Sequence, residues 1–237
     1  MAEATAQAMA KRRSDSTEAE FKARRLSMVA EQLEQRDIDD PDVLAAMRTV
    51  PRHLFVPERR NRDTAYSDGP QVIGYGQTIS QPYVVASMTQ LLELKPSDRI
   101  LEIGTGCGYQ AAVLAEIVKQ VYTVEIIPEL VRRARQTLKD LGYRNVTVVD
   151  DDGSFGYPKA APYDGILVTA AAPKMPEELV RQLKIGRHMV LPMATDKWGR
   201  QFLYKITRTE TGTESERLYE VRFVPMVGDI EGRDFSF

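Results

Sequence analysis

The sequence predicts an α/β fold built on a doubly wound, mostly parallel sheet of seven strands. From Arg99 onward, short apolar runs alternate with amphipathic stretches, which is the pattern of β-α-β units around a parallel sheet. Two late runs of alternating polar and apolar residues are joined by Thr211-Gly212-Thr213 and predict an antiparallel hairpin at one edge. Helical periodicity before Arg99 predicts an N-terminal helical elaboration of this sheet.

Three helices and a loop are expected before the sheet. Apolar residues recur at helical spacing over residues 21–36, with charged residues between them. Asp40 and Pro41 suit the cap and the first position of a second helix over residues 41–50. Residues 58–76 are expected to form a loop, and a third helix is expected to open at Ser80-Gln81-Pro82 and to end near residue 92.

The sheet is predicted from seven runs with three helices between them. Strand and helix signals follow one another along the chain, so each helix is expected to connect two parallel strands. The expected strands are 99–103, 121–125, 146–149, 165–169, 188–191, 201–208 and 217–224, and the expected helices are 109–118, 128–141 and 176–183.

Charge and cysteine content limit the function classes. The net charge of −2 provides no basic footprint for nucleic acid. No apolar run approaches the roughly 20 residues that span a membrane. Cys107 is the single cysteine, which excludes an intrachain disulfide and favours a reducing cytoplasm. We therefore expect a cytoplasmic protein without nucleic-acid or membrane partners, and we favour a monomer.

The segment Leu-Glu-Ile-Gly-Thr-Gly-Cys-Gly at residues 101–108 predicts a cofactor site. Its glycines allow positive φ and let a ligand approach main-chain atoms. The helix expected from Tyr109 would point its unpaired N–H groups at the same place. A dinucleotide fits this loop poorly, because Gly108 comes one residue too early for the fingerprint and Glu102 would repel a pyrophosphate.

These features favour S-adenosylmethionine as the cofactor. Its amine and sulfonium are cationic, so Glu102 beside a glycine loop would attract it. Glu125 ends the second strand, where an acid can accept ribose hydroxyls. Asp152 follows the third strand and could accept the adenine amino hydrogens, although a solvated turn explains it as well. The candidate cofactor-binding residues are Glu102, Gly104, Thr105, Gly106, Gly108, Glu125, Asp152 and Gly153, and no metal site is expected.

The glycine turn with its three acids resembles the class I S-adenosylmethionine methyltransferases. The upstream segment Gly76-Gln77-Thr78-Ile79-Ser80-Gln81-Pro82 is similar to the signature of the protein-L-isoaspartate O-methyltransferases, which repair isoaspartyl linkages in aged proteins. The resemblance covers about residues 22–228. Further matches are Val50-Pro51-Arg52, Phe55-Val56-Pro57, Asp152-Gly153, Val168-Thr169-Ala170-Ala171 and Phe223-Val224-Pro225.

The resemblance implies a Rossmann-like methyltransferase fold. It implies transfer of the methyl group of S-adenosylmethionine to the free carboxylate of L-isoaspartyl residues in damaged proteins and peptides, with D-aspartyl residues as a second candidate substrate. We expect disordered tails at residues 1–20 and 229–237, and one methyltransferase domain at 21–228. Within the domain, 21–95 would form the helical and substrate-loop part, and 96–228 the cofactor-binding core.

Methylation of a carboxylate does not require a general base, because the carboxylate is already ionised at neutral pH. The enzyme must position it and remove water from it. A hydroxyl donor can orient the carboxylate, which makes Ser80 and Thr78 the catalytic candidates; the resemblance implies Ser80 as the active-site position. The alternative for Ser80 is the N-cap of the following helix. Ile79 and Gln201 are the candidate substrate-binding residues.

The chain departs from the family pattern at three places. Asp151 stands where a glycine is usual, Ile185-Gly186-Arg187 where the family has Pro-Gly-Gly, and Val72 where proline is common. Asp151 adds negative charge near the expected adenine site. None of the three removes a group that the chemistry needs.

Three other functions remain as alternatives. A nucleic-acid methyltransferase would be expected to carry an Asn/Asp-Pro-Pro-aromatic motif after the fourth strand, where this chain has Thr169-Ala170-Ala171-Ala172-Pro173. An enzyme that methylates one dedicated peptide would use the same chemistry. A non-catalytic binder of the cofactor or of isoaspartyl protein would not need the intact set of Ser80 and the three acids.

Overall fold

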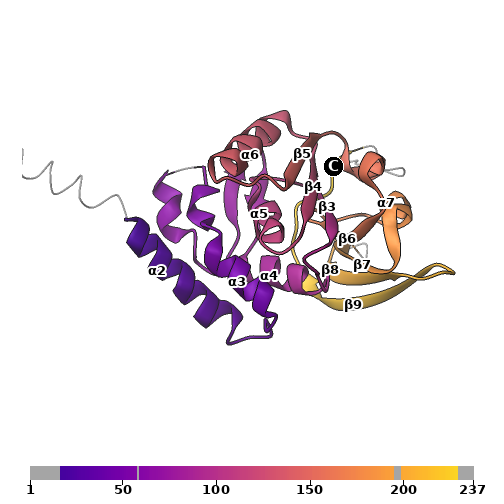
Figure 1. Cartoon of the computed structure of the whole chain (residues 1–237), viewed down its shortest axis with the longest axis horizontal. Helices are drawn as coiled ribbons and strands as arrows, with labels where there is room; N and C mark the ends of the chain where they lie inside the picture. Colours follow the sequence, from indigo (N-terminus) through magenta and orange to yellow (C-terminus); the bar gives the residue numbers. More distant parts are fainter. Residues whose placement is uncertain (1–16, 58, 195–198, 229–237) are drawn as a thin grey trace, which may run out of the picture.

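A seven-stranded sheet forms the centre of the protein in the computed structural model, which describes residues 17–57, 59–194 and 199–228 (Figure 1). The strand order is β5-β4-β3-β6-β7-β8-β9, with β5 to β7 parallel and β8 and β9 antiparallel. The predicted fold class is confirmed. The strands are β3 Arg99–Ile103, β4 Gln120–Glu125, β5 Val146–Asp150, β6 Tyr163–Val168, β7 Leu183–Ala194, β8 Gln201–Arg208 and β9 Thr213–Val221.

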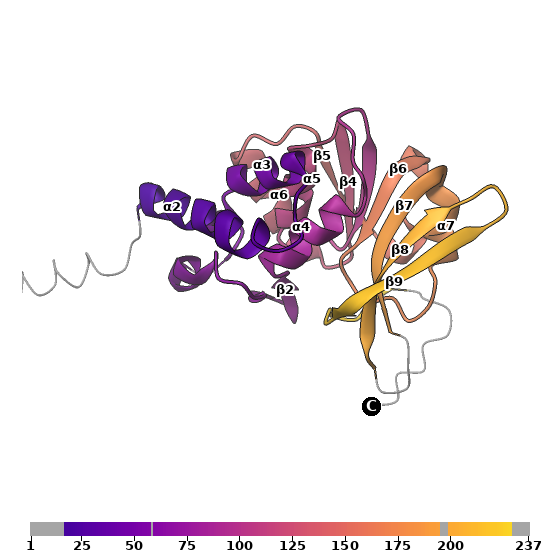
Figure 2. The same ribbon diagram turned by 90° about the horizontal axis from the view of Figure 1, so that it is seen from below.

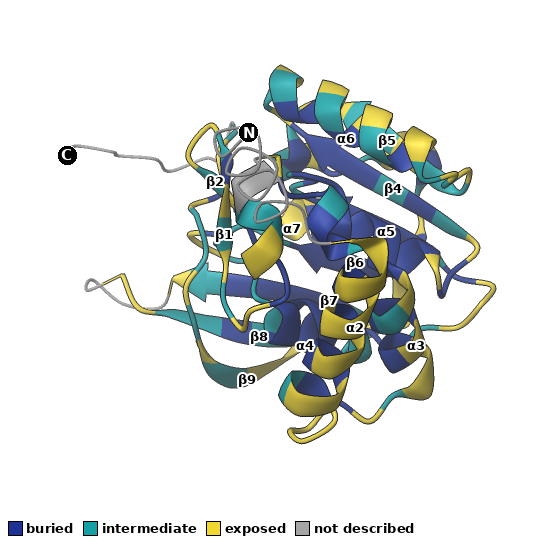
Figure 3. Ribbon diagram, turned by 90° about the vertical axis from the view of Figure 1, so that its left-hand side faces the viewer, coloured by how far each residue is buried: buried dark blue, intermediate teal, exposed yellow. Residues whose placement is uncertain are grey.

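Both faces of the sheet are buried, because consecutive strand residues point to opposite sides. Ile100 and Leu167 belong to one apolar cluster, and their neighbours Leu101 and Ile166 belong to the other. Buried residues follow the strands and the inner helix faces, whereas the outer face of the first helix is exposed (Figure 3). Near-continuous apolar strands are therefore explained by helices on both faces.

Helices α4, α5 and α6 supply apolar residues to the first cluster, and α7 supplies them to the second. The N-terminal helices pack outside α4 and α5, at the end of the molecule opposite the β8–β9 hairpin (Figure 2). The helices are α2 Glu18–Met28, α3 Pro41–Thr49, α4 Pro82–Gln90, α5 Tyr109–Ala115, α6 Pro128–Asp140 and α7 Glu177–Gln182. In the described part of the chain, no helix is long and apolar enough to span a membrane.

The first helix begins earlier than residue 21, because Thr17 caps it. The Thr17 hydroxyl accepts a hydrogen bond from the Glu20 N–H, and the Glu20 carboxylate accepts one from the Thr17 N–H. The helix continues into a π-helical turn, Val29–Leu33. Asp40 caps α3 as predicted. Of the two expected tails, residues 1–16 and 229–237 lie outside the described residues.

The segment predicted as a loop contains more structure than expected. A 3₁₀ helix spans Arg59–Thr64, and strands β1 Gln71–Gly74 and β2 Gln77–Ile79 form an antiparallel hairpin. Three successive residues at its tip, Tyr75 and the glycines on either side, have positive φ. A non-glycine residue rarely adopts positive φ, so the sequence of this tip does not predict a hairpin. Two features hold the hairpin against the rest of the protein. The Ile73 side chain is buried, and the Ile73 carbonyl accepts a hydrogen bond from Arg133 on α6 at 2.6 Å.

Two strand boundaries also differ from the prediction. Strand β7 begins at Leu183 and not at residue 188, because its pairing with β6 passes over an irregularity that contains Gly186 at φ +76°. Strand β9 ends at Val221 and not at residue 224. Beyond it, the side chain of Gln201 bonds the main chain of Phe223, with 2.6 Å and 3.1 Å contacts, in place of a further rung of the ladder.

Candidate active site

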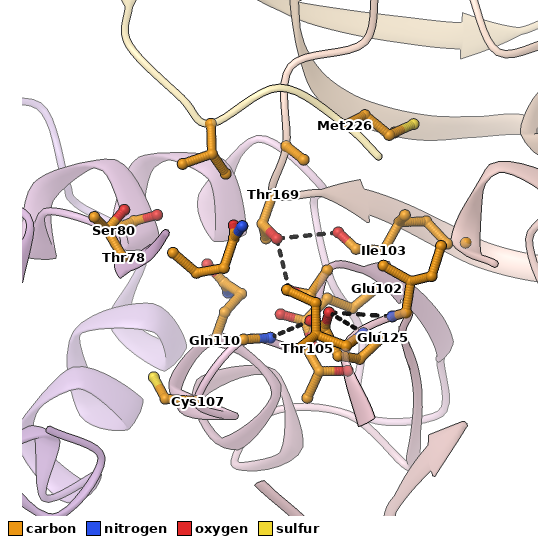
Figure 4. A pocket seen from close by; sticks show the side chains of 18 of the residues that line it. Thr78, Ser80, Glu102, Ile103, Thr105, Cys107, Gln110, Glu125, Thr169 and Met226 are labelled. Carbon is orange, nitrogen blue, oxygen red and sulfur yellow. Dashed lines mark hydrogen bonds between the residues drawn. The ribbon is translucent and has the colours of Figure 1, made fainter. Parts of the chain in front are cut away.

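A pocket opens at the carboxyl ends of β3, β4 and β6 (Figure 4). Ligands of open α/β sheets bind at this edge, next to the strand where the chain changes direction across the sheet. That strand is β3, because β4 and β6 both follow it in the sequence and lie on opposite sides of it. Thr78 and Ser80 lie at one side of the pocket, and Glu102 and Glu125 lie at the other. The glycine loop, the β1–β2 hairpin and the segment after β9 therefore meet around one cavity.

All three glycines of the loop have positive φ. Gly104, Gly106 and Gly108 have φ of +92°, +55° and +90°. Space is limiting at Gly104, because a Cβ there would lie 2.4 Å from the Thr169 hydroxyl oxygen. That hydroxyl donates to the carbonyls of Ile103 and Gly104 at 3.0 and 2.7 Å, so it holds the end of β3 against β6.

The Glu125 carboxylate holds the same loop from the next strand. One oxygen accepts the Gly106 N–H at 2.8 Å, and the other accepts the N–H groups of Ile126 and Ile127 at 3.1 and 3.0 Å. Thr105 adds a 2.6 Å hydroxyl contact with Thr123. Glu125 is buried and borders the pocket, so the residue expected to accept ribose hydroxyls also shapes the loop.

Glu102 is fully buried and borders the pocket. Neither carboxylate oxygen forms a hydrogen bond with the described residues. Burial raises the pKa of Glu102 to about 8; the nearby Thr123 hydroxyl opposes this rise, and the Glu125 carboxylate adds to it. A buried acid without a partner has a strong preference for a cationic group beside it.

Asp152 lies beside the pocket and not in its wall. It caps a 3₁₀ turn, Gly153–Phe155, by accepting the Ser154 N–H at 2.9 Å, whereas Gly153 does border the pocket. Asp152 therefore has a structural role as a cap, and its contact with adenine stays a prediction. Asp151 is exposed and does not border the pocket, so the extra charge at this departure from the family pattern is not part of the pocket wall.

Thr78 and Ser80 border two cavities at once. One is the pocket above, and the other is a cavity of about 440 Å³ between the start of α4 and the segment after β9. Thr169 and Val224 are the other two residues that border both. Ser80 does not cap α4, since the cap position is Gln81 and no side chain caps that helix. Its hydroxyl is not used in the local helix geometry.

The two candidate substrate-binding residues differ in position. Ile79 is buried and borders the glycine-loop pocket. Gln201 borders neither cavity, and its amide is occupied by the main chain of Phe223. Direct contact of Gln201 with a peptide is therefore not supported, because its donor and acceptor already orient the segment that carries Val224.

Thr169 and Gln110 were not among the predicted site residues. Thr169 joins the two cavities, and Gln110 borders the pocket and donates to the Thr89 hydroxyl at 2.9 Å. The position of Thr169 directly after the fourth strand was the available signal, because such positions lie at the ligand edge of the sheet. Gln110 gave none, since it lies within an apolar helix.

The chemistry of these residues fits S-adenosylmethionine. Glu102 offers an unpartnered buried carboxyl group, the loop exposes main-chain groups, and the apolar side chains that border the pocket suit an adenine ring. Among these apolar residues are Ile103, Val124, Ile126, Ile127 and Met226. Among the described residues, no group of three or more acidic, histidine or cysteine side chains is placed to hold a metal ion.

Comparison with known proteins also indicates an S-adenosylmethionine-dependent methyltransferase. Residues 23–231 match the family model described as protein-L-isoaspartate(D-aspartate) O-methyltransferase. A protein-L-isoaspartate O-methyltransferase of Picosynechococcus sp. is 51% identical over 210 residues, which cover 89% of this chain and 93% of the relative. A protein of the same name from Ignicoccus hospitalis is 54% identical, over 78% of this chain and 89% of its own length.

Two solved structures share the fold over most of the chain. A protein-L-isoaspartate O-methyltransferase superposes with a TM-score of 0.79 and 27% identity over 87% of this chain, which spans 66% of that longer protein. A Plasmodium falciparum protein assigned to the same enzyme class was solved with S-adenosyl-L-homocysteine. It superposes with a TM-score of 0.73 and 28% identity over 86% of this chain and 98% of its own.

Proposed function

This chain belongs to the protein-L-isoaspartate(D-aspartate) O-methyltransferase family, and we infer that it methylates the free carboxylate of L-isoaspartyl residues with S-adenosylmethionine as methyl donor. The observation that carries the inference is the position of Ser80 and Thr78. Their side chains border both the acidic cofactor pocket and the second cavity. A carboxylate bound there would lie between the peptide groove and the cofactor.

When bound, S-adenosylmethionine supplies an electrophilic methyl group. Glu102 provides the negative charge for its cationic part, and Glu125 and Asp152 are the acids that would bind its ribose and adenine. The cofactor and site assignments of these residues are proposals. They are supported by the unpartnered carboxyl of Glu102 and by the glycine loop that Glu125 holds in place.

Ser80 and Thr78 would donate hydrogen bonds to the isoaspartyl carboxylate and hold one oxygen toward the cofactor pocket. The carboxylate needs no base, because it is ionised at neutral pH. Consistent with this, neither histidine borders either cavity. His53 contacts Tyr66 and Glu18, and His188 contacts Thr207 and Glu93. Catalysis would therefore depend on alignment and on exclusion of water.

A transfer assay tests this function. Incubation with methyl-labelled S-adenosylmethionine and a short isoaspartyl peptide should label the peptide, and mild base should release the label as methanol, as expected of a carboxyl methyl ester. Binding of both ligands without release of labelled methanol would instead show a non-catalytic binder. Stable label in nucleic acid would favour the rival methyltransferase class.

We also propose that substrates include damaged proteins as well as peptides, and that D-aspartyl residues are a second substrate class. We propose a cytoplasmic monomer that acts without nucleic acid. The single, buried Cys107 supports a reducing compartment, and the net charge of −2 supports the lack of a nucleic-acid partner. Cell fractionation and light scattering of the purified protein would test location and oligomeric state.

A further inference from the structure

We propose that Arg222 recognises a carboxylate next to the isoaspartyl residue, so that the enzyme favours peptides with an acidic side chain one or two positions from the damaged residue. This inference rests on the proposed function, because it concerns the peptide that would occupy the second cavity. It assigns a specificity-determining role to a residue outside the catalytic candidates.

The second cavity has the position and form of a peptide groove. It runs along Tyr219 to Val224 on one side and along the start of α4 on the other. It meets the cofactor pocket at Thr78, Ser80, Thr169 and Val224. A peptide whose isoaspartyl carboxylate reaches Ser80 would therefore leave its neighbouring residues along this segment.

Two guanidinium groups border the groove, and only one is already occupied. Arg36 contacts the Asp68 carboxylate at 3.3 Å and lies over the Tyr83 ring at 3.4 Å from its centroid. Arg222 is exposed and forms no hydrogen bond or ion pair with the residues that the structure describes. Arg36 is thus part of the groove wall, whereas Arg222 borders the groove as a cation without a partner among the described residues.

Chain geometry limits which substrate position Arg222 can reach. Extended chain advances about 3.3 Å per residue, so Arg222 lies at most about 7 Å along the chain from Val224, which borders both cavities. An extended peptide beside this segment advances at the same rate. The carboxylate that Arg222 meets would therefore belong to a residue one or two positions from the isoaspartyl residue.

Glu220 restricts the expected preference for an acidic residue to substrate positions close to the isoaspartyl residue. It also borders the groove, two residues farther from Val224 than Arg222, and its carboxylate would repel an acid placed there. An acidic residue is therefore expected to help only near the transfer site. Because Arg222 is exposed, solvent screens its field, and the expected gain is about two- to fivefold in kcat/KM.

The experiment uses isoaspartyl hexapeptides that are identical except for Glu, Gln or Lys at one position. Each of the two positions before and after the isoaspartyl residue is varied in turn. At one or two of them, the wild-type enzyme should use the Glu peptide about two- to fivefold better than the Gln peptide through a lower KM, and the Lys peptide less well. Calorimetric Kd values without turnover should follow the same order. The preference should fall at high salt, where the screening length is about 3 Å at 1 M.

Matched variants assign the preference to one side chain. Arg222→Gln should bring the Glu to Gln ratio to about one, and Arg222→Lys should keep part of it. Arg217→Gln is the control, because Arg217 lies on β9 over the Phe202 ring at 4.8 Å and borders neither cavity; it should keep the wild-type ratio.

The outcomes separate this inference from the function on which it rests. Equal use of Glu and Gln peptides at every position by the wild type would overturn the inference alone, as would an unchanged ratio in Arg222→Gln. Failure to methylate any isoaspartyl peptide would overturn the proposed function and the inference with it.

Discussion

Ser80 is the side chain whose position decides the proposed chemistry. Its hydroxyl lies where the two cavities meet and is not used to cap α4. A hydrogen bond to a charged group contributes about 1.5–3 kcal/mol. We therefore predict that Ser80→Ala lowers kcat about tenfold to a hundredfold and leaves the Kd for the cofactor within about twofold. Steady-state kinetics and cofactor titration measure the two quantities.

Ser80→Thr is the control for this prediction, since it keeps a hydroxyl at the same position and should retain more activity than the alanine variant. Equal losses in kcat and in cofactor affinity after Ser80→Ala would contradict the assignment, because they would indicate a general disturbance of the pocket.

Glu102 predicts a pH dependence of cofactor binding. Its pKa of about 8 means that the free enzyme holds it protonated at neutral pH, whereas a cationic ligand favours the ionised form. Cofactor affinity should therefore rise with pH up to about 8 in the wild type. Glu102→Gln should bind the cofactor about ten- to a hundredfold more weakly at pH 8. Titrations between pH 6 and 9 measure both effects.

The ratio of wild-type to Glu102→Gln affinity isolates this residue, because the ligand's own amine titrates equally for both proteins. A ratio that does not change with pH would contradict the account. The dependence of folding stability on the protonation of Glu102 gives a second measurement. Because the folded-state pKa lies above the ordinary value of 4.5, the Glu102 contribution to the free energy of unfolding should fall as pH rises from about 4.5 to about 8, and Glu102→Gln should lack this fall.

Asp152 is predicted to act on cofactor binding and not on chemistry. Asp152→Ala should weaken cofactor affinity and leave kcat at saturating cofactor near the wild-type value. Asp152→Asn is the matched variant, since its side-chain oxygen can still cap the 3₁₀ turn by accepting the Ser154 N–H. An unchanged cofactor Kd in both variants would remove Asp152 from the cofactor site.

Which site residues can be predicted from sequence depends on where their partners lie. Glu102 and Glu125 follow from local position, because each ends or precedes the end of a parallel strand. The contacts of Gln201 do not follow from local position, because its amide bonds the main chain of Phe223, 22 residues away. That Arg222 has no partner among the described residues also depends on tertiary contacts that no local pattern encodes.

At the scale of the elements, the glycine loop depends on close packing as well as on backbone freedom. A side chain at positive φ costs about 1–2 kcal/mol. Gly104→Ala adds contact of its Cβ with the Thr169 hydroxyl, whereas Gly142→Ala has comparable φ, +83°, and no atom within 4 Å. We predict that Gly104→Ala lowers the free energy of unfolding by about 1–3 kcal/mol more than Gly142→Ala.

Denaturant unfolding of the two glycine variants measures this difference. Gly104→Ala should also weaken cofactor binding, because a displaced Thr169 would release the end of β3; Gly142→Ala should not. Equal destabilisation by both substitutions would show that Gly104 is needed only for its backbone conformation.

Elements with continuous apolar or helical periodicity could be predicted, and those fixed by distant contacts could not. The parallel strands and their connecting helices follow from alternation along the chain. The β1–β2 hairpin does not, because its glycine-rich tip resembles a loop, and contact with Arg133 on α6 anchors it. Strand β7 was predicted too short, since Gly186 resembles a turn but lies within a pairing irregularity.

At the scale of the whole molecule, the proposed active site forms where three distant parts of the chain meet. The sheet edge provides the acids and the glycine loop, the hairpin before α4 provides Thr78 and Ser80, and the segment after β9 closes the peptide side. The sequence resemblance predicted the first two, but it could not show that two cavities share a border. That shared border is the basis for assigning one cavity to the cofactor and the other to the peptide.

The most direct test of this assignment compares isoaspartyl peptides with their normal aspartyl twins, which have the same atoms in a different linkage. Several unrelated sequences should be used, so that an enzyme for one dedicated peptide is recognised by its activity on a single pair. We predict methylation of every isoaspartyl peptide and no detectable methylation of the aspartyl twins. Equal methylation of both linkages, or of neither, would contradict the account.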